Sequence, residues 1–512
     1  MKSIALFCAA MAALTGSVAM AADNYSAGGW STLHQDSGNR RYVDVDIVSA
    51  DYRIWQALAG ATVLTAPTTS PDGRQIYVTT GMTKGHSNLH AFSIDGQLLW
   101  QSDPWQSADE GVDPCAFLSS PIVDEAGDLF VSDCNQLFAF SPDGAVKWKI
   151  ELPSIQFGDW VAAGTHPVNT FTTAVFTRDG HLLGVTNFGD VVVVERTTGA
   201  LVNQAYRLPG ALPPYSKAVS MPDSVFANDF MDSDFREWAW QLIFGGSMRS
   251  ANTPAVAQSG RIYVVGSSVK KGFGSLYALD LSASETGVLV EESFVTDIGL
   301  GSGSSPALSP QEDRVYVSDE EGWLYSIDAS SGAIVWKVKT RATAGAAAVG
   351  GDGVIYALQA YAPALVAVDP QGNILWESDF SGLAHEQLPV STFLGDPVAT
   401  GNGNPTVTRD AVLVPVVYGY QIPMTNITVP VRSAVAAVDL KTGEAVMDVV
   451  SLPGDSSGIT AVLRDGTLVS SIGDAMTSAV SPLKPFMDLL LPQNLTVMHA
   501  VGGIQVAIPQ KN

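Results

Sequence analysis

Basic residues are scarce in this chain. Its 512 residues include 27 Lys and Arg against 51 Asp and Glu, which gives a formal net charge of −24 at pH 7. Nucleic acids and anionic lipid surfaces attract basic proteins, because their phosphates are negatively charged. The composition therefore argues against both as partners. Two explanations of the acidity stay open: a solvated surface that keeps the protein soluble, or an acidic docking site.

Cysteine is equally rare, with three in the whole chain. Cys8 lies in an N-terminal apolar run without a lipobox-like context, so we expect no lipid anchor. Cys115 and Cys134 are separated by 18 residues. In an exported protein such a pair predicts a disulfide, which the chain-entropy model values at roughly 3 kcal/mol. Two buried free thiols are the alternative.

The apolar run at the N-terminus is too short to span a membrane. Ile4–Leu14 follows the positively charged Lys2 and precedes the small-x-small sequence Ala19-Met20-Ala21. A spanning helix needs about 20 apolar residues, whereas this pattern is typical of a secretory signal peptide. We predict a signal peptide over residues 1–21 and a periplasmic or secreted product without a transmembrane segment.

Several catalytic signatures are missing from the sequence. There is no P-loop, no dinucleotide fingerprint and no nucleophile elbow, and no spacing sets a Ser-His-Asp triad. The run 228–235 places Asp229, Asp232 and Asp234 close together, but it lacks the glycine and the closing glutamate of a calcium loop. We therefore predict no metal site there.

What the chain does contain is a repeat of about 50 residues. Each copy has a short strand after small residues and Pro, an acidic turn with Gly, a strand with a central aromatic residue, a further strand, and a last strand after a Gly turn. The weaker eighth copy has strands over 467–471 and 497–501. The eight copies cover residues 66–100, 119–148, 179–199, 253–280, 304–336, 352–376, 404–443 and 464–501.

Four short strands in a unit of this length are typical of a propeller blade. Asp-Gly and Thr/Ser-Gly pairs supply the positive φ of tight hairpins, and Val, Ile and aromatic residues alternate as in half-buried sheets. One blade cannot bury both faces by itself, whereas a closed ring can. We predict an all-β, eight-bladed β-propeller of four-stranded antiparallel blades. The central aromatics are then packing residues: Tyr77, Phe130, Tyr263, Tyr316 and Tyr356.

The last strand of the repeat carries a family resemblance. The segments AFSIDGQLLW, AFSPDGAVKW, SIDASSGAIVW and AVDPQGNILW end at Trp100, Trp148, Trp336 and Trp376. They resemble the repeat of the PQQ-like (quinoprotein-type) β-propellers, in which Trp docks between neighbouring blades. The resemblance covers roughly residues 50–505, although the third, fourth and seventh copies keep Thr-Gly and lack the Trp. It implies an architecture similar to the β-propeller factor of the outer-membrane β-barrel assembly machinery and to quinoprotein alcohol dehydrogenases.

The domain organisation follows from the repeats. We expect an N-terminal segment over 22–60, then one propeller domain over 61–512 with insertions at about 207–250 and 476–493. The strand RIWQA (53–57) could complete the last blade, and GIQVAIP (503–509) competes for that place. Each insertion is either a cap packed on the ring or an exposed docking surface.

The resemblance leaves more than one function open. Quinoprotein dehydrogenases of this fold hold PQQ and Ca²⁺ on the axis, commonly beside a disulfide of adjacent cysteines. This chain has no Cys-Cys pair and no convincing match to the metal-ligand motifs. We expect a monomeric scaffold that binds a protein or a small-molecule ligand. The alternatives are a PQQ- and Ca²⁺-dependent dehydrogenase of an alcohol or sugar, and an unrelated enzyme on the same scaffold.

A ligand site would lie at the axial mouth, where the inner strands begin. Arg249 and Asn252 could bind a carboxylate or carbonyl there, and His166 could act as a base or metal ligand. With Asn404, these three are the predicted binding residues. Alternatively, such side chains satisfy loop backbone or channel water. The polar residues that precede inner strands are Asp113, His166, Asn169, Arg249, Asn252, His385 and Asn404.

Overall fold

The computed structural model describes most of the chain from residue 24 to residue 510. The ranges outside the description are 1–23, 27–28, 48–50, 81–87, 106–118, 134–135, 153–170, 172, 187–188, 211–251, 271, 302–303, 343–344, 360–363, 389–391, 393–394, 402, 422–427, 457, 493 and 511–512. The predicted signal peptide, both Cys115 and Cys134, and the acidic run 228–235 therefore lie outside the described residues.

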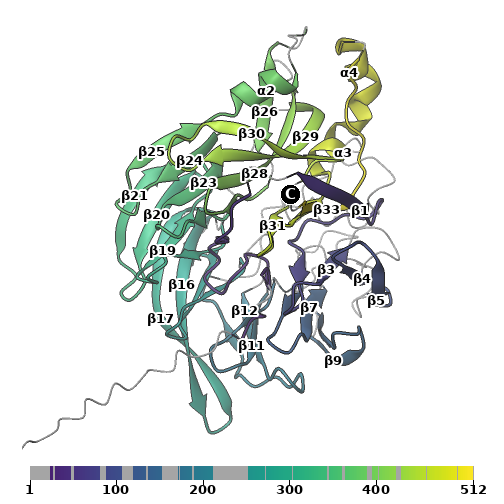
Figure 1. The fold of residues 1–512 in the computed structure, drawn as a ribbon. Helices are drawn as coiled ribbons and strands as arrows, with labels where there is room; N and C mark the ends of the chain where they lie inside the picture. Colours follow the sequence, from purple (N-terminus) through teal and green to yellow (C-terminus); the bar gives the residue numbers. More distant parts are fainter. Residues whose placement is uncertain are drawn as a thin grey trace, which may run out of the picture.

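Eight antiparallel sheets surround a common axis and form an eight-bladed β-propeller (Figure 1). Blades one to three contain β2 (Thr68–Thr69), β3 (Gln75–Thr80), β4 (Asn88–Ser93) and β5 (Leu98–Gln101); β6 (Ile122–Val123), β7 (Leu129–Asp133), β8 (Gln136–Phe140) and β9 (Val146–Glu151); β10 (Val175–Phe176), β11 (Leu182–Val185), β12 (Asp190–Val194) and β13 (Tyr206–Arg207). Blades four to six contain β14 (Ala255–Val256), β15 (Ile262–Ser267), β16 (Phe273–Ser284) and β17 (Gly287–Leu300); β18 (Ala307–Leu308), β19 (Arg314–Ser318), β20 (Trp323–Asp328) and β21 (Ile334–Lys339); β22 (Ala348–Val349), β23 (Ile355–Gln359), β24 (Ala364–Val368) and β25 (Ile374–Ser378). Blade seven has five strands, β26 (Pro397–Gly401), β27 (Thr406–Val407), β28 (Ala411–Gln421), β29 (Thr428–Asp439) and β30 (Ala445–Leu452). Blade eight contains β31 (Thr460–Val462), β32 (Leu468–Ile472), β33 (Gly503–Pro509) and β1 (Tyr52–Ala57). The predicted fold class is confirmed.

The apolar core lies between blades rather than within them. One cluster joins Phe130 and Leu137 of blade two to Phe176 and Leu182 of blade three, and the other described clusters likewise combine successive blades. The central aromatics predicted to pack in this core are almost fully buried: Tyr77, Phe130, Tyr263, Tyr316 and Tyr356. Since each sheet has two apolar faces, a blade gains its stability from both neighbours.

Ring closure uses both ends of the chain. β1 supplies the outer strand of blade eight and pairs with β33 over its whole length, from Tyr52 opposite Pro509 to Ala57 opposite Ile504. The two segments considered for the outer strand, 53–57 and 503–509, are thus neighbours in one sheet. The expectation of a strand over 497–501 was wrong, because these residues form no strand and β33 takes its place. Residues 503–509 form this strand because they pair with β32 on one side and with β1 on the other.

The tryptophans of the repeat lie against glycines of the following blade. Trp100 Nε1 donates to the carbonyl of Pro142 at 2.9 Å, and an ideal Cβ on Gly144 would lie 2.6 Å from the Trp100 ring. Trp148, Trp336 and Trp376 make the same two contacts with their next blades. Glycine is required at these turns both for the positive φ, which is 89° at Gly144, and for the space that the indole occupies.

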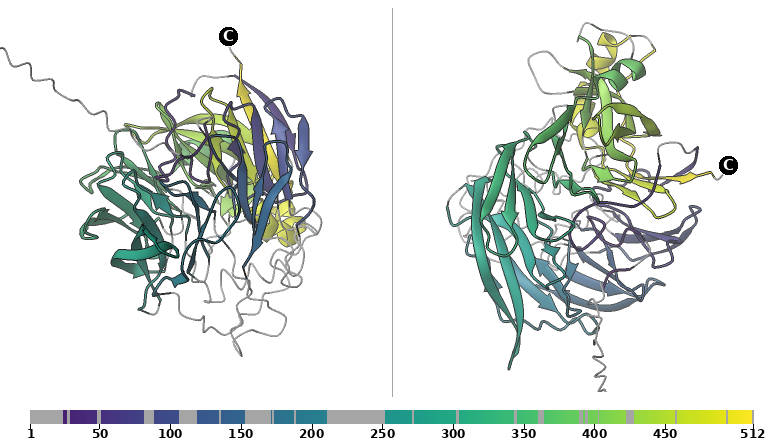
Figure 2. Two further views of the ribbon diagram at one scale, coloured as in Figure 1. Left: turned by 90° about the horizontal axis from the view of Figure 1, so that it is seen from below. Right: turned by 60° about the vertical axis from the view of Figure 1, so that its left-hand side comes forward.

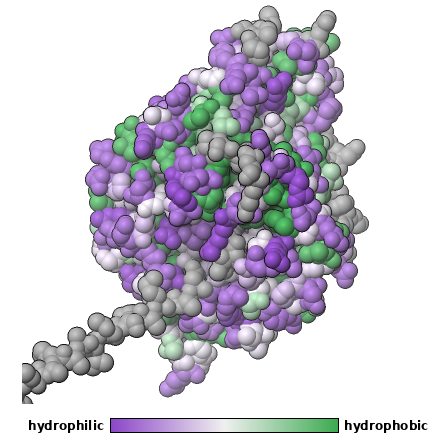
Figure 3. All heavy atoms as spheres, in the orientation of Figure 1, coloured by the Kyte–Doolittle hydropathy of each residue, from purple (hydrophilic) through white to green (hydrophobic). Residues whose placement is uncertain are grey.

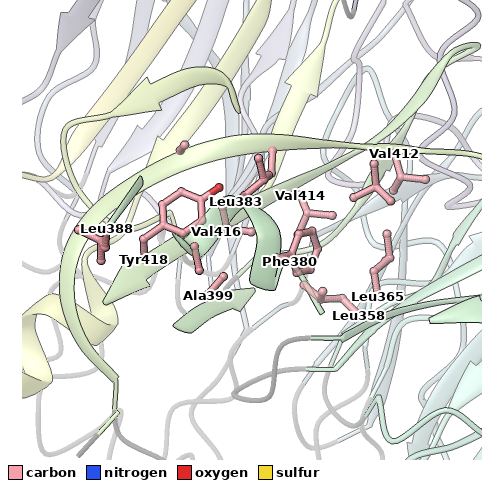
Figure 4. Packing of buried hydrophobic residues seen from close by; sticks show 14 of the residues in the cluster. Leu358, Leu365, Phe380, Leu383, Leu388, Ala399, Val412, Val414, Val416 and Tyr418 are labelled. Carbon is pink, nitrogen blue, oxygen red and sulfur yellow. The ribbon is translucent and has the colours of Figure 1, made fainter. Parts of the chain in front are cut away.

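Blade seven and the end of blade eight carry short helices beyond the ring. These are α2 (Ser381–Gln387), α3 (Ala475–Val480), the 3₁₀ turn η3 (Ser481–Leu483) and α4 (Lys484–Leu490). Phe380, Leu383 and Leu388 pack with Tyr418 of β28 in the core shared by blades six and seven (Figure 4). The unit α3–η3–α4, which we call the helical projection, extends beyond the ring at the top of the right-hand view of Figure 2.

Candidate functional site

An N-terminal strap, described over residues 24–26 and 29–47, lies across one end of the propeller axis. It is the purple segment at the centre of Figure 1. Inner-strand N–H groups donate to strap carbonyls: Thr69 to Trp30, Val123 to Ser31, Val256 to Ser37, Leu308 to Gly38, Val349 to Arg40 and Val407 to Arg41, at 2.7–3.0 Å. The Asn24 side chain adds a bond to Thr177 of blade three at 2.7 Å. The strap therefore hydrogen-bonds to seven blades and ties their inner edges together.

Two side chains of the strap, His34 and Arg41, form a buried polar pair. Arg41 is 0% exposed and His34 is 3% exposed. Arg41 Nη1 lies 3.3 Å from His34 Nδ1, and Nη2 donates to the carbonyl of Ala346, just before β22. Burial lowers the pKa of Arg41 to about 9, so its guanidinium is still charged at neutral pH. Burial and the Arg41 charge hold the pKa of His34 well below its usual value, so its ring is neutral.

Asn39 holds the strap to two blades through one amide group. Its Nδ2 lies 2.9 Å from the carbonyl of Pro306, 3.1 Å from that of Pro254 and 3.3 Å from that of Thr253. Its backbone has a φ of 59°, a left-handed conformation that Asn adopts more readily than most residues. Asn39 thus donates to carbonyls just before two inner strands, β14 and β18.

The axial-mouth residues predicted from sequence fall in different places. Asn252 precedes β14 of blade four, and its N–H donates to Val265 at 2.9 Å. Asn404 precedes β27 of blade seven, where it bridges Ile459 of blade eight. His385 is exposed on α2 and belongs to the helices beyond the ring. Asp113, His166, Asn169 and Arg249 lie outside the described residues. Their convergence on a ligand stays a prediction.

A pair of buried carboxylates lies at the root of the helical projection. Asp474 and Asp455 are both 0% exposed. The Asp474 side chain accepts from the N–H groups of Asp455, Val501 and Gly502 at 2.5–2.9 Å. Asp455 in turn accepts from two N–H groups in the first turn of α3. Desolvation, followed by the charge of Asp455, raises the pKa of Asp474 to about 7. This pair fastens both ends of the projection to blade eight.

The helical projection exposes a group of large apolar side chains. Leu483, Phe486 and Leu489 are 44%, 59% and 82% exposed, and together they are called the apolar tip below. On the other side of α4, Met487 and Leu491 are buried in the core shared with blade seven. The face of the molecule drawn in Figure 3 is mostly hydrophilic, with apolar residues in scattered groups. Three exposed apolar side chains on one short projection are therefore a candidate contact surface.

Other kinds of site have less support among the described residues. In that part of the chain no group of three or more His, Cys, Asp and Glu could hold a metal ion. A groove of about 370 Å³ lies between blades four and five, lined by Arg261, Asp280, Glu312 and Asp328 among others. Arg261 is already paired with Asp280 at 2.9 Å. No helix in the described ranges is long and apolar enough to cross a membrane.

Sequence reasoning missed the strap and the carboxylate pair. The run from His34 to Arg41 is dense in polar side chains upstream of the first repeat, and this density was the available signal. It has no periodicity that relates it to the blades. Asp455 and Asp474 are 19 residues apart and on either side of two strands, so their spacing indicates no contact.

The eight closed blades and the Trp–Gly contacts between them are the features expected of a PQQ-like β-propeller. A family model described as "Outer membrane protein assembly factor BamB" matches residues 187–448, just over half of the chain. This chain belongs to that family. A search of curated proteins finds no match.

Solved structures share the fold at low sequence identity. A europium-containing methanol dehydrogenase superposes with a TM-score of 0.55 at 14% identity, covering 95% of this chain and 99% of the other. BamB from Moraxella catarrhalis gives 0.51 at 12%, covering 90% and 99%. The quinohemoprotein alcohol dehydrogenase ADHIIG from Pseudomonas putida HK5 gives 0.57 at 14%, covering 95% and 81%. At these identities the likeness extends to the fold alone.

Proposed function

We propose that this chain is an exported β-propeller that acts as an interaction scaffold in the periplasm and binds another protein. The observation that carries the proposal is the apolar tip. Its residue Leu489 is 82% exposed, whereas the opposite side of α4 is packed in the core. Export rests on the sequence pattern of residues 1–21, which we propose as the signal peptide. The family description, an outer membrane protein assembly factor, supports a partner in the cell envelope.

The expected partner presents an apolar patch or groove with basic side chains around it. Burying Leu483, Phe486 and Leu489 would supply the apolar centre of a small interface. The net charge of −24 would favour a basic rim, because complementary charge accelerates encounter and excludes acidic surfaces. The helical projection would thus form the apolar centre of the contact, and the acidic surface of the propeller would orient a partner with basic residues around that centre.

The PQQ-dependent alternative rests on the fold alone. Ca²⁺ requires several oxygen ligands, whereas the buried pair of the strap, His34 and Arg41, supplies a neutral imidazole and a guanidinium. These side chains do not fit a Ca²⁺ site. The alternative is tested by adding PQQ and Ca²⁺ to the mature protein, then measuring retained cofactor after gel filtration and dye reduction with a panel of alcohols. Retention with turnover would replace the scaffold proposal.

The scaffold proposal is tested at the apolar tip. A Phe486→Glu, Leu489→Glu variant replaces the two most exposed side chains of the apolar tip and leaves Met487 and Leu491 unchanged. Val146→Glu is the matched control, since Val146 is 58% exposed on β9 of blade two, far along the chain from the projection. Mature, C-terminally tagged proteins are cross-linked in envelope extract and the captured proteins identified. We expect the tip variant to lose a partner that the wild type and the Val146 variant both capture. Equal capture by all three would overturn the proposal.

A further inference from the structure

We propose that Asp455 and Asp474, at the root of the helical projection, form a proton-dependent latch that is closed while the pair holds one proton and opens when that proton is lost. By the root we mean these two residues, the first turn of α3 and residues 501–502. Opening of the latch is a property of this chain alone. Its consequence for the apolar tip, weaker binding of a protein partner, rests on the proposed function.

The latch joins segments that are distant in the chain. The N–H of Asp474 donates to the carbonyl of Asp455 at 2.9 Å, and the Asp474 side chain accepts from the N–H of Asp455 at the same distance. The Asp474 side chain also accepts from the N–H groups of residues 501–502 at 2.5 and 2.6 Å, where the chain returns to β33. Asp455 accepts from residues 476–477 at 3.1 and 2.9 Å. Both ends of the projection are therefore held by two side chains.

Both carboxyl groups are withdrawn from water. Asp455 and Asp474 are 0% exposed, and an ideal Cβ on Gly454 would lie 2.3 Å from Asp474 Oδ1, so the backbone packs directly against this group. Among the ion pairs formed by the described residues, none includes Asp474. Two neighbouring buried carboxylates disfavour each other's ionised form, because their charges repel and neither is hydrated. The closed root is therefore most stable with one proton on the pair.

Two opposing effects act on Asp474. Its N–H donors favour the ionised carboxylate, but burial and the charge of Asp455 outweigh them and raise the pKa of Asp474 to about 7. In an opened root the side chain would be hydrated, and its pKa would return to about 3.9. The open state thus releases the proton more readily. Closure is therefore strongest below pH 4 and weakens as pH rises through 7.

The other charged groups near the root are few. The strands β31, β32 and β33 and the helix α3 contain no charged residue. β29 packs against α3 and carries Arg432 and Asp439, but Arg432 is exposed and donates to Gln387, and Asp439 accepts from residues 441–442. His499 is exposed, two residues before Val501. It is the titratable residue that the experiment must control.

Opening of the root would change how the apolar tip is held. Met487 and Leu491 would still pack in the core shared with blade seven, but α3 would lose the hydrogen bonds of its first turn to Asp455. The tip would then be less rigidly placed. Since a partner must order the groups that it binds, binding through the tip should weaken as the latch opens.

The latch is tested on the mature protein alone by amide hydrogen exchange, with rates divided by the intrinsic rate at each pH. The amides to follow are those that donate to the pair: Asp455, Met476, Thr477, Val501 and Gly502. We expect their protection to fall about 100-fold between pH 5 and 8. It should stay below that of β7 in blade two at every pH, because the opening is local. Protection that does not depend on pH, or exchange of the root at the rate of β7, would overturn the proposal.

Two variants identify the group that titrates. Asp474→Asn cannot lose a proton, so its root should show little dependence on pH. His499→Gln is the matched control and should keep the wild-type profile. If Asp474→Asn does not fold, the wild type and His499→Gln still decide the matter, because a pH dependence that disappears in His499→Gln would refute the latch.

The consequence for binding is measured separately. Cross-linking capture in envelope extract is repeated at pH 5.5 and pH 8 with the wild type and with the tip variant Phe486→Glu, Leu489→Glu. Capture through the tip should be weaker at pH 8. Equal capture at both pH values, together with pH-dependent exchange, would overturn the regulation of binding. Absence of tip-dependent capture at both values would count against the proposed function, whereas the exchange data would still decide whether the latch exists.

Discussion

The indole of Trp148 in blade two lies against Gly199 in blade three. An ideal Cβ on Gly199 would be 2.8 Å from two atoms of the ring, and Trp148 Nε1 donates to the carbonyl of Arg196 at 2.9 Å. The same relationship joins Trp55 to Gly96, Trp100 to Gly144, Trp336 to Gly372 and Trp376 to Gly443, and Phe294 takes the aromatic position against Gly332. One aromatic side chain and one glycine thus recur at most of the contacts between blades, and both are needed for the close approach.

Gly199→Ala should destabilise the protein through two effects. The φ of 74° disfavours any Cβ, and the added methyl group would collide with the Trp148 ring. We expect a loss of about 3 kcal/mol, of which about 1 comes from the backbone. Gly272→Ala separates the two effects, because Gly272 has a φ of 82° with nothing within 4 Å of its Cβ position. Denaturant unfolding of both variants provides the measurement, and equal losses would contradict the packing explanation.

Trp55→Ala should weaken ring closure. Trp55 lies on the N-terminal strand β1, packs near Phe92 of blade one and donates to the carbonyl of Ile94 at 3.0 Å. Removing a fully buried aromatic side chain typically costs about 3–5 kcal/mol, and Trp55 is half-buried, so we expect a loss toward the lower end of that range. Ile54→Ala on the same strand is the control, since Ile54 is 47% exposed and should change stability little. Thermal unfolding that failed to distinguish the two variants would mean that β1 contributes little to closure.

Replacing Asn39 with glycine should destabilise the protein less than replacing it with alanine. Asn39→Gly removes the bonds to Thr253, Pro254 and Pro306 but keeps a residue that adopts the φ of 59°, and we expect a loss of about 1–3 kcal/mol. Asn39→Ala should lose about 1 kcal/mol more, because alanine disfavours this conformation. Chemical denaturation of the two variants measures both the loss of the hydrogen bonds and the additional cost of the backbone conformation. The reverse order would show that the backbone there is not strained.

Stability should fall as pH rises from 5 to 8. The folded pKa of Asp474 is about 7, above the value of about 3.9 in an unfolded chain. Its contribution is therefore fully present below pH 4 and is lost as pH rises through 7, because the unfolded chain releases the proton more readily. The linkage amounts to about 3 kcal/mol between pH 5 and 8. Unfolding of Asp474→Asn, which cannot titrate and tolerates the φ of 52°, should show a much smaller dependence.

Asp488→Asn is the control for this pH dependence. Asp488 lies on the same helical projection, but its pKa is lowered by the bonds that it accepts from Val497, Lys484 and Thr496 in spite of partial desolvation. Its titration is complete below pH 5, so the slope between pH 5 and 8 should match that of the wild type. If Asp474→Asn kept the full wild-type slope, the buried pair would not be its source.

The repeat was readable in the sequence because each blade uses the same local devices. Aromatic residues such as Tyr316 recur at the same strand position, and Gly-containing turns precede Trp336 and Trp376, so the fold class followed from spacing alone. Blade eight was harder to read, because the helical projection separates β32 from β33. The segment 497–501 has an equally suitable strand composition, but the extended pairing of β33 with both neighbours decided between the two candidates.

The candidate sites were much less predictable. The polar run of the strap contains residues able to bind ligands, yet nothing in it shows that Arg41 is buried or that His34 lies beside it. Likewise, Asp474 and Asp455 are ordinary loop aspartates in the sequence. The raised pKa of Asp474 and the role of the pair depend on exclusion from water, which is a property of the packed molecule.

The amino-acid sequence by itself therefore determined the number of blades, their order and the residues that pack between them, because these depend on short-range periodicity repeated along the chain. The tertiary structure decided where the strap lies, which strand follows the helical projection and which charges are buried. The reason is physical: Arg41 contacts Ala346 across 305 residues of chain, and interactions at that separation arise only when the ring has closed.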